Sequence, residues 1–340
     1  MNPPSCWASA ISEEDARLPD LEAWEPGCFD DYQRRFPQTP PLELPCVSHS
    51  DAFLRAWPAV GDTHSTVYRS LAGRLKGAEV VLARGFLGNW MPGNFVAVAR
   101  GLRRLGADAW IVRSSPRRGA PENGQVLQKQ VLQEQVLNKR RGQATPDRPL
   151  FWFGHSKGGL ECLFAHDHPE LKHRTGAILM AQTPRGPSPV IESLLLREHQ
   201  DSLQTRRRRL AEQCQRLGLG LIGARGGGLA LTSAAQSTVQ GQIAPILAAP
   251  RDFPVVQTAT WSDRPTSWLD SFHERLGEIA PGIAHDGQFY LHDLLWPGLP
   301  HILLDRVDHA QPAMGGFGFD PLRYWLAALA VALKLAPKST

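Results

Sequence analysis

Short, mainly apolar runs alternate with segments of helical spacing through the middle of the chain. The sequence predicts buried strands at residues 78–83, 108–114, 149–154 and 176–182, because strands covered on both faces read as nearly continuous apolar stretches. Residues 94–106 have helical spacing and close on a glycine, and residues 125–141 are rich in helix-forming residues. Strands that alternate with helices predict an α/β fold with a doubly wound, mainly parallel sheet.

This alternation breaks between residues 190 and 250 and then resumes. Leucines recur every seven residues at Leu196, Leu203, Leu210 and Leu217, which predicts an amphipathic helix with one apolar stripe. We therefore expect residues 190–250 to form a mainly helical cap or lid whose opening exposes an apolar surface. Two further apolar runs, 253–260 and 301–307, predict strands, and the spacing over 321–335 predicts a final amphipathic helix.

The first part of the chain follows neither pattern. Residues 1–75 are rich in proline, tryptophan and acidic residues, and they predict an irregular extension with one or two short helices, such as one over 50–60. The predicted organisation is thus an N-terminal extension over 1–75 and a first part of the core over 76–189. The insertion over 190–250 and a second part of the core over 251–340 complete it.

Composition and charge are those of an ordinary soluble protein. Of the 340 residues, 42% are hydrophobic and 21% are charged, which is typical of globular domains. The net charge of +4 is uneven, because residues 1–60 carry ten acidic and four basic side chains, a net of −6, and the remainder carries +10. We interpret the acidic segment as a solvated extension, with docking onto the basic remainder as the alternative.

Cysteine usage and the N-terminal residues bear on location. The five cysteines are odd in number and fit no zinc-binding spacing, which favours a reducing compartment. The first residues do not combine a basic start with an apolar core, so they do not resemble a secretory signal. No apolar stretch reaches the ~18 residues that a membrane span needs. We therefore predict a cytoplasmic protein, and export by a route without a cleaved signal stays open.

A serine between glycines follows the run at 149–154. Gly154, Ser156 and Gly158 form the pattern G-x-S-x-G between a predicted strand and a predicted helix. A serine in such a sharp turn exposes its hydroxyl at the end of the sheet, and the flanking glycines leave room for neighbouring backbone. A serine that only caps the following helix is the structural alternative.

Several segments in the same order resemble those of known enzymes. "GHSKGG" resembles the lipase box of α/β hydrolases, and "QTPRGPSPVIE" resembles the Thr-Pro segment of bacterial triacylglycerol lipases. "ARGFLGNW" is similar to their His-Gly oxyanion turn, and "HDGQF" and "VDHAQPAM" are similar to their Asp-Gly and Asp-His segments. The resemblance spans about residues 78–335 and implies an α/β-hydrolase fold with a serine nucleophile. It does not define the substrate.

A serine nucleophile requires a base and a carboxylate that orients the base. His309 follows the run at 301–307 and precedes the final helix, where this fold places the base, whereas His155 is expected to pack beneath the turn. Asp286 matches the Asp-Gly segment and precedes His309 by 23 residues. Asp263 follows the run at 253–260, where many hydrolases carry the acid, so it stays open as the rival to Asp286.

The oxyanion of the reaction requires two backbone N–H donors. The resemblance implies that Lys157, the residue after the nucleophile, provides one and that Phe86 provides the other. Arg84 stands where lipases usually have histidine, and Lys157 brings a cation where many relatives have a neutral residue. Both departures bear on the substrate more than on the mechanism, and the sequence offers no account of the Lys157 charge.

These residues predict a serine hydrolase that cleaves carboxylic esters through an acyl-enzyme on Ser156, with no metal and no organic cofactor. The expected partner is a small-molecule or lipid acyl ester, with transient contact to a lipid surface. A thioesterase, amidase or acyltransferase could use the same triad, and a non-catalytic binding protein with this fold is the second alternative. The sequence does not predict an oligomeric state.

Three other patterns carry less weight. Residues 218–223 satisfy G-x-G-x-x-G, but they follow a helical segment and lack an acid in the next ~20 residues, so they do not predict a dinucleotide site. The "HDH" at 166–168 is interpreted as a solvated helix end and not as a metal site. Four arginines at 206–209 are interpreted as a solvated helix face, with an anionic lipid or phosphate as the alternative. No nucleic-acid motif accompanies them, so we predict no nucleic-acid partner.

Overall fold

The computed structural model describes residues 32–42, 47–91, 93–140, 148–196, 223–262, 269–316 and 318–336. Several features of the sequence lie outside these ranges. They are the first 31 residues, most of the leucine stripe, the arginine run at 206–209, most of the glycine pattern at 218–223, and Asp263.

Six parallel strands form one sheet with the order β2-β1-β3-β4-β5-β6. The strands are β1 (Glu79–Ala83), β2 (Asp108–Ile111), β3 (Leu150–His155), β4 (Thr175–Ala181), β5 (Val255–Trp261) and β6 (His301–Asp305). Each overlaps one of the apolar runs, which confirms the α/β prediction. The chain moves from β1 outward to β2 and returns to β3 on the other side of β1, so the order reverses between β1 and β3. Binding sites of open α/β sheets lie at the carboxyl ends of the strands beside such a reversal.

The side chains of each strand alternate between two apolar layers. Phe151 and Phe153 of β3 belong to the cluster on one face of the sheet. Leu150 and Trp152 belong to the cluster on the other face. All four are buried, which explains why the strand reads as a continuous apolar run and not as an alternating one.

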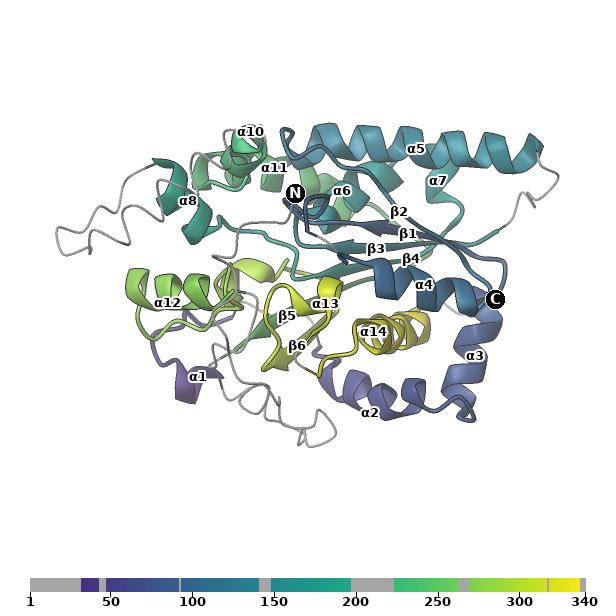
Figure 1. Cartoon of the computed structure of the whole chain (residues 1–340), viewed down its shortest axis with the longest axis horizontal. Coiled ribbons are helices and arrows are strands. Elements are labelled where there is room, and N and C mark those ends of the chain that lie inside the picture. Colours follow the sequence, from purple (N-terminus) through teal and green to yellow (C-terminus); the bar gives the residue numbers. More distant parts are fainter. Residues whose placement is uncertain are drawn as a thin grey trace, which may run out of the picture.

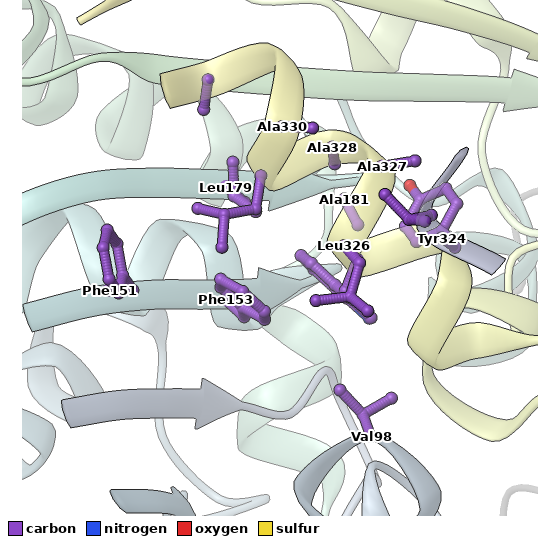
Figure 2. Close-up of a cluster of buried hydrophobic side chains, with 14 of the residues drawn as sticks. Val98, Phe151, Phe153, Leu179, Ala181, Tyr324, Leu326, Ala327, Ala328 and Ala330 are labelled. Carbon is purple, nitrogen blue, oxygen red and sulfur yellow. The ribbon is translucent and has the colours of Figure 1, made fainter. Parts of the chain in front are cut away.

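Four helices cover the first face, below the sheet in Figure 1. They are α2 (Ser50–Gly61), α3 (Thr66–Leu75), α4 (Val96–Arg104) and α14 (Pro321–Leu335). Phe53 of α2 packs edge-on against Tyr324 of α14, with ring centroids 5.7 Å apart. Figure 2 shows small residues of α14, including Ala328, beside the large side chains of the strands. The later part of the predicted N-terminal extension therefore contributes two helices to this layer.

The second face is covered by α5 (Ala120–Arg140), α6 (Lys157–His166), α7 (Pro169–Lys172) and α11 (Ser233–Ala248). Val239 and Ile243 of α11 are buried in the cluster on this face. This helix lies within residues 190–250, which the sequence predicted as a cap or lid, yet its apolar residues pack in the layer that covers the sheet. The division of the chain into four regions stays a prediction.

Shorter elements gather beyond the carboxyl ends of the strands. They are α1 (Tyr32–Arg35), α8 (Pro189–Leu196), α10 (Arg225–Leu229), α12 (Asp270–Ile279), the 3₁₀ helix η4 (Leu291–Leu294) and α13 (Gln311–Met314). Figure 1 shows α8 and α12 at the left, beyond the sheet. An apolar cluster that includes Val190 and Leu194 of α8 and Leu276 of α12 joins these two helices. Among the described helices, none is both long and apolar enough to cross a lipid bilayer.

Candidate active site

Ser156 occupies a strained turn between β3 and α6. Its φ of 55° and ψ of −133° lie outside the regions that non-glycine residues prefer, at a cost of roughly 1–3 kcal/mol. The flanking glycines explain how the turn fits. A Cβ on Gly154 would lie 2.5 Å from the Cα of Gly159, and a Cβ on Gly158 would lie 2.2 Å from the carbonyl oxygen of Ala83. The pattern therefore makes a turn and does more than cap a helix.

The turn after β1 lies directly against this serine. A Cβ on Gly85 would lie 2.7 Å from the Ser156 Cβ and 3.1 Å from its Oγ, so a side chain at Gly85 would displace the serine. Phe86 is the next residue, and its ring lies close to Gly227 and Gly228 around α10. Lys157 is the first residue of α6, where backbone N–H groups have no acceptor within the helix. The structure thus brings both predicted oxyanion segments to the serine.

Asp286 and His309 form a buried hydrogen-bonded pair. The distance between His309 Nδ1 and Asp286 Oδ2 is 2.7 Å, and the His309 amide donates to the Asp286 carbonyl at 2.8 Å. The other carboxylate oxygen of Asp286 accepts from the amides of Gln288 and Phe289, both at 2.9 Å. Burial by itself would raise the pKa of Asp286, but His309 and the two amides outweigh it and hold this pKa below its usual value. Asp286 is therefore an ionised acceptor that orients His309.

The second ring nitrogen of His309, Nε2, takes no part in the pair with Asp286. This atom is buried, and it has no hydrogen-bond partner among the described residues. The ring packs between Phe289 and His155, with centroid distances of 5.1 Å and 4.9 Å. Because His155 immediately precedes Ser156, the predicted base lies at the turn that carries the predicted nucleophile. The structure shows Asp286 against His309, whereas Asp263, the rival acid, lies outside the described residues, so the choice between the two acids stays a prediction.

His155 and Gln182 hold the backbone that carries His309. His155 is buried beneath the turn, as expected, and its Nε2 lies 2.6 Å from the His309 carbonyl oxygen. Gln182 Nε2 donates to the carbonyl of Asp308 at 2.9 Å, and Gln182 Oε1 lies 3.2 Å from His155 Nε2. Burial and the neighbouring His309 lower the pKa of His155 to about 3. His155 is therefore neutral, with its proton on Nε2, and two consecutive carbonyls of the loop are held in place.

Lys157 and Glu161 form a buried pair inside α6 that the sequence analysis missed. Their side chains are 2% and 0% exposed, and Lys157 Nζ lies 3.4 Å from Glu161 Oε1. The sequence does indicate that Lys157 and Glu161 can pair, because residues four apart on a helix lie side by side. The burial of both charges was not visible in the sequence, since it depends on distant segments.

The remaining candidates for metal binding have other partners. His166 Nδ1 donates to the Leu163 carbonyl at 2.7 Å, and His168 Nδ1 accepts from the Glu170 amide at 3.3 Å. Both contacts satisfy helix ends, so the motif is the end of a helix, but the expectation of a solvated end is wrong for His166, which is buried against Phe253. In the part of the chain that the structure describes, no group of three or more histidine, cysteine, aspartate or glutamate side chains could hold a metal ion.

Asp308 precedes His309 and is fully buried. Its Oδ1 accepts from the amides of Ala310 at 2.6 Å and Gln311 at 3.0 Å, whereas Oδ2 has no partner among the described residues. Burial raises the pKa of Asp308 to about 7, although these two amides oppose the shift. An aspartate in an unfolded chain titrates near 3.9. The folded protein therefore binds more protons than the unfolded chain between about pH 4 and 7, and this group lowers stability as the pH rises through that window.

Replacing Asp308 by asparagine should remove this contribution, because the amide is neutral at every pH. Relative to the wild type, Asp308→Asn should become more stable as the pH is raised from about 5 to 8. Urea unfolding of both proteins across this range measures the difference. Parallel curves of unfolding free energy against pH would contradict the assignment.

Comparison with known proteins supports the fold alone. No protein-family model matches the chain, and no curated protein matches it. The structure resembles that of the metagenomic carboxyl esterase MGS0156, with a TM-score of 0.52, 17% sequence identity, and 76% of each chain covered. It also resembles the phospholipase PlaB from Legionella pneumophila in complex with thio-NAD, with a TM-score of 0.51 and 12% identity. That match covers 77% of this chain and 59% of PlaB. The chain thus has the α/β-hydrolase fold, as predicted.

Proposed function

We propose that the protein is a serine hydrolase that cleaves carboxylic esters through an acyl-enzyme on Ser156. The observation that carries the proposal is the 2.7 Å hydrogen bond between Asp286 and His309, formed beside a strained serine turn. Buried ion pairs and strained serines both occur without catalysis. Their conjunction at the carboxyl edge of an α/β-hydrolase sheet supports a nucleophile, a base and an orienting acid.

The proposed reaction begins when Ser156 Oγ attacks the ester carbonyl and His309 Nε2 takes the hydroxyl proton. Asp286 stabilises the resulting imidazolium, and the amides of Lys157 and Phe86 stabilise the oxyanion. The tetrahedral species collapses, His309 returns the proton to the departing alcohol, and the acyl group remains on Ser156. A water molecule then gives a proton to His309 and attacks the acyl carbonyl. The second tetrahedral species collapses with return of this proton from His309 to Ser156 Oγ, which releases the carboxylic acid and regenerates the serine.

The proposed substrate is a small-molecule or lipid acyl ester. Support comes from the two structural neighbours, which are described as a carboxyl esterase and a phospholipase. Exposed apolar side chains support transient contact with lipid. Trp90 is 58% exposed in the segment that follows the Gly85 turn, and Val96 is 40% exposed at the start of α4.

A fluorophosphonate probe tests the serine directly, because it forms a covalent bond only with an activated hydroxyl. The folded wild-type protein should be labelled at Ser156, and Ser156→Ala should not be labelled. A panel of p-nitrophenyl esters of increasing acyl length, run beside acyl-CoA, then separates ester from thioester hydrolysis. Absence of labelling together with absence of ester turnover would refute the proposal, whereas faster turnover of acyl-CoA would replace it by a thioesterase.

A further inference from the structure

The buried Lys157–Glu161 pair is not required by the proposed reaction, since only the amide of Lys157 has a role there. Placing two opposite charges in a protein interior costs several kcal/mol per ion unless hydrogen bonds satisfy them. Both side chains lie on α6 and are almost fully buried, at 2% and 0% exposure. Their remaining partners show what this pair is connected to.

Most of those partners lie on residues 112–119, the segment that follows β2 and precedes α5. Glu161 accepts from Asn123 Nδ2 at 2.8 Å and from the hydroxyl of Ser114. Lys157 Nζ donates to the Arg118 carbonyl at 2.8 Å. Burial raises the pKa of Glu161, and the interactions with Lys157, Ser114 and Asn123 oppose this shift. The pair therefore fastens the segment after β2 to the helix that carries the serine turn.

The same segment also holds the turn after β1. The carbonyl of Ser114 accepts from Asn89 Nδ2, and Asn89 Oδ1 accepts from Arg84 Nη1 at 3.2 Å. Arg84 and Asn89 flank the turn that contains Phe86. Ser114 thus reaches α6 through its hydroxyl and the turn after β1 through its carbonyl, so a continuous path of polar contacts joins Lys157 to that turn.

The two ends of this path are the two segments that supply the proposed oxyanion donors. Such donors act only when both N–H groups point at one atom, and functional groups of this kind must be held to within about 0.5 Å. The amide of Lys157 is fixed by α6 and that of Phe86 by the turn after β1. The pairing of β1 with β3 brings these elements together, and the polar path joins them a second time beyond the ends of the strands, where the two donors lie.

We propose that the buried Lys157–Glu161 pair, acting through Ser114 and Asn89, sets the separation of the two oxyanion donors. The Lys157 and Glu161 side chains are positioning groups, since they act on the reaction only through the backbone. This inference depends on the proposed serine hydrolase activity. It also accounts for the cation beside the nucleophile, since the Lys157 ammonium is buried, pairs with Glu161 and donates to the Arg118 carbonyl.

Three variants test the link. Lys157→Met removes the ammonium but keeps the amide, Glu161→Gln removes the charge but keeps the shape, and the double variant removes both charges. Each single variant should lower kcat for a p-nitrophenyl ester by about tenfold with little change in KM, because misplaced donors weaken only the transition state. The double variant should lose less than the product of the two single effects, since both act on one link.

The rate of fluorophosphonate labelling at Ser156 should fall by a similar factor, because phosphonylation develops charge on the same donors. Lys172→Met is the matched control. Lys172 pairs with Asp167 at 3.5 Å, but their side chains are 37% and 49% exposed, so kcat and labelling rate should stay within twofold of the wild type. If a charge-removing variant does not fold, Ser114→Ala replaces it, because this change removes only the hydroxyl contact and should still lower kcat severalfold.

The outcomes separate the two proposals. If the wild type is neither labelled nor active, the proposed function fails. If the wild type is active, and the folded variants keep its kcat and labelling rate while losing only thermal stability, the pair is merely structural and this inference is overturned. A fall in kcat with an unchanged KM, matched by slower labelling, supports it.

Discussion

Asp286→Asn is expected to lower kcat for a p-nitrophenyl ester by about four orders of magnitude. Asparagine has the same shape, and its side-chain oxygen can still accept from the amides of Gln288 and Phe289. What changes is the partner of His309 Nδ1, which lies 2.7 Å from the carboxylate in the native protein. An amide cannot stabilise the imidazolium, and its NH₂ favours the tautomer with the proton on Nε2. That tautomer cannot accept the proton of Ser156.

Comparison with Asp263→Asn completes this experiment. Both variants are assayed at saturating substrate, and their folding is checked by circular dichroism and by thermal unfolding. Asp263→Asn should retain most of the wild-type kcat, because no step of the proposed reaction uses Asp263. A large loss in Asp263→Asn together with an active Asp286→Asn would show that the acid has been assigned to the wrong residue.

The choice between these two acids shows where the sequence stops being informative. Asp263 and Asp286 both follow β5 and precede His309, so their order in the chain does not distinguish them. The structure brings Asp286 under His309 by a backbone hydrogen bond and by a side-chain hydrogen bond. Both contacts are made by loops between strands, and apolar periodicity carries no signal for loop paths. The Asp-Gly resemblance was the sequence feature that favoured Asp286, the acid that the structure shows hydrogen-bonded to His309.

The sheet and the serine turn were predictable for local reasons. All the strands except the edge strand β2 are buried along nearly their whole length, so they read as apolar runs in the sequence. The serine turn needs glycine at Gly154 and Gly158 because backbone atoms lie within 3 Å of where a Cβ would be. Such steric requirements leave a pattern in the chain itself.

Contacts between distant segments could not be predicted in this way. Glu161 is four residues from Lys157, but its burial depends on Ser114 and Asn123, which precede it by 47 and 38 residues. Gln182 likewise binds the carbonyl of Asp308, 126 residues away. Each side chain is ordinary for its position in the sequence, and only the fold shows that it supports the site.

Trp325 of α14 contacts both the core and the candidate site. Among the substitutions proposed here, its replacement by alanine should lower the free energy of unfolding the most. The indole stacks on Phe153 of β3 at 5.0 Å with planes 10° apart, and its centroid lies 5.5 Å from that of Phe95. Its Nε1 donates to the carbonyl of Pro312 at 2.8 Å, in the short helix that follows His309. Figure 2 shows labelled residues of the cluster to which it belongs, among them Phe153.

Trp325→Ala is expected to lower the free energy of unfolding by about 3–5 kcal/mol, because it removes a large buried side chain and leaves a cavity. Urea unfolding followed by circular dichroism measures the change. Trp325→Phe keeps an aromatic ring beside Phe153 but removes the donor to Pro312, so it should cost about 1–2 kcal/mol.

Trp90→Ala is the matched control, since Trp90 is 58% exposed and its removal should change the free energy of unfolding by no more than about 0.5 kcal/mol. Equal losses for Trp325→Ala and Trp90→Ala would mean that α14 is not packed as described. If Trp325→Ala loses the most unfolding free energy, then one side chain both stabilises the core and binds the loop that follows His309, the proposed base.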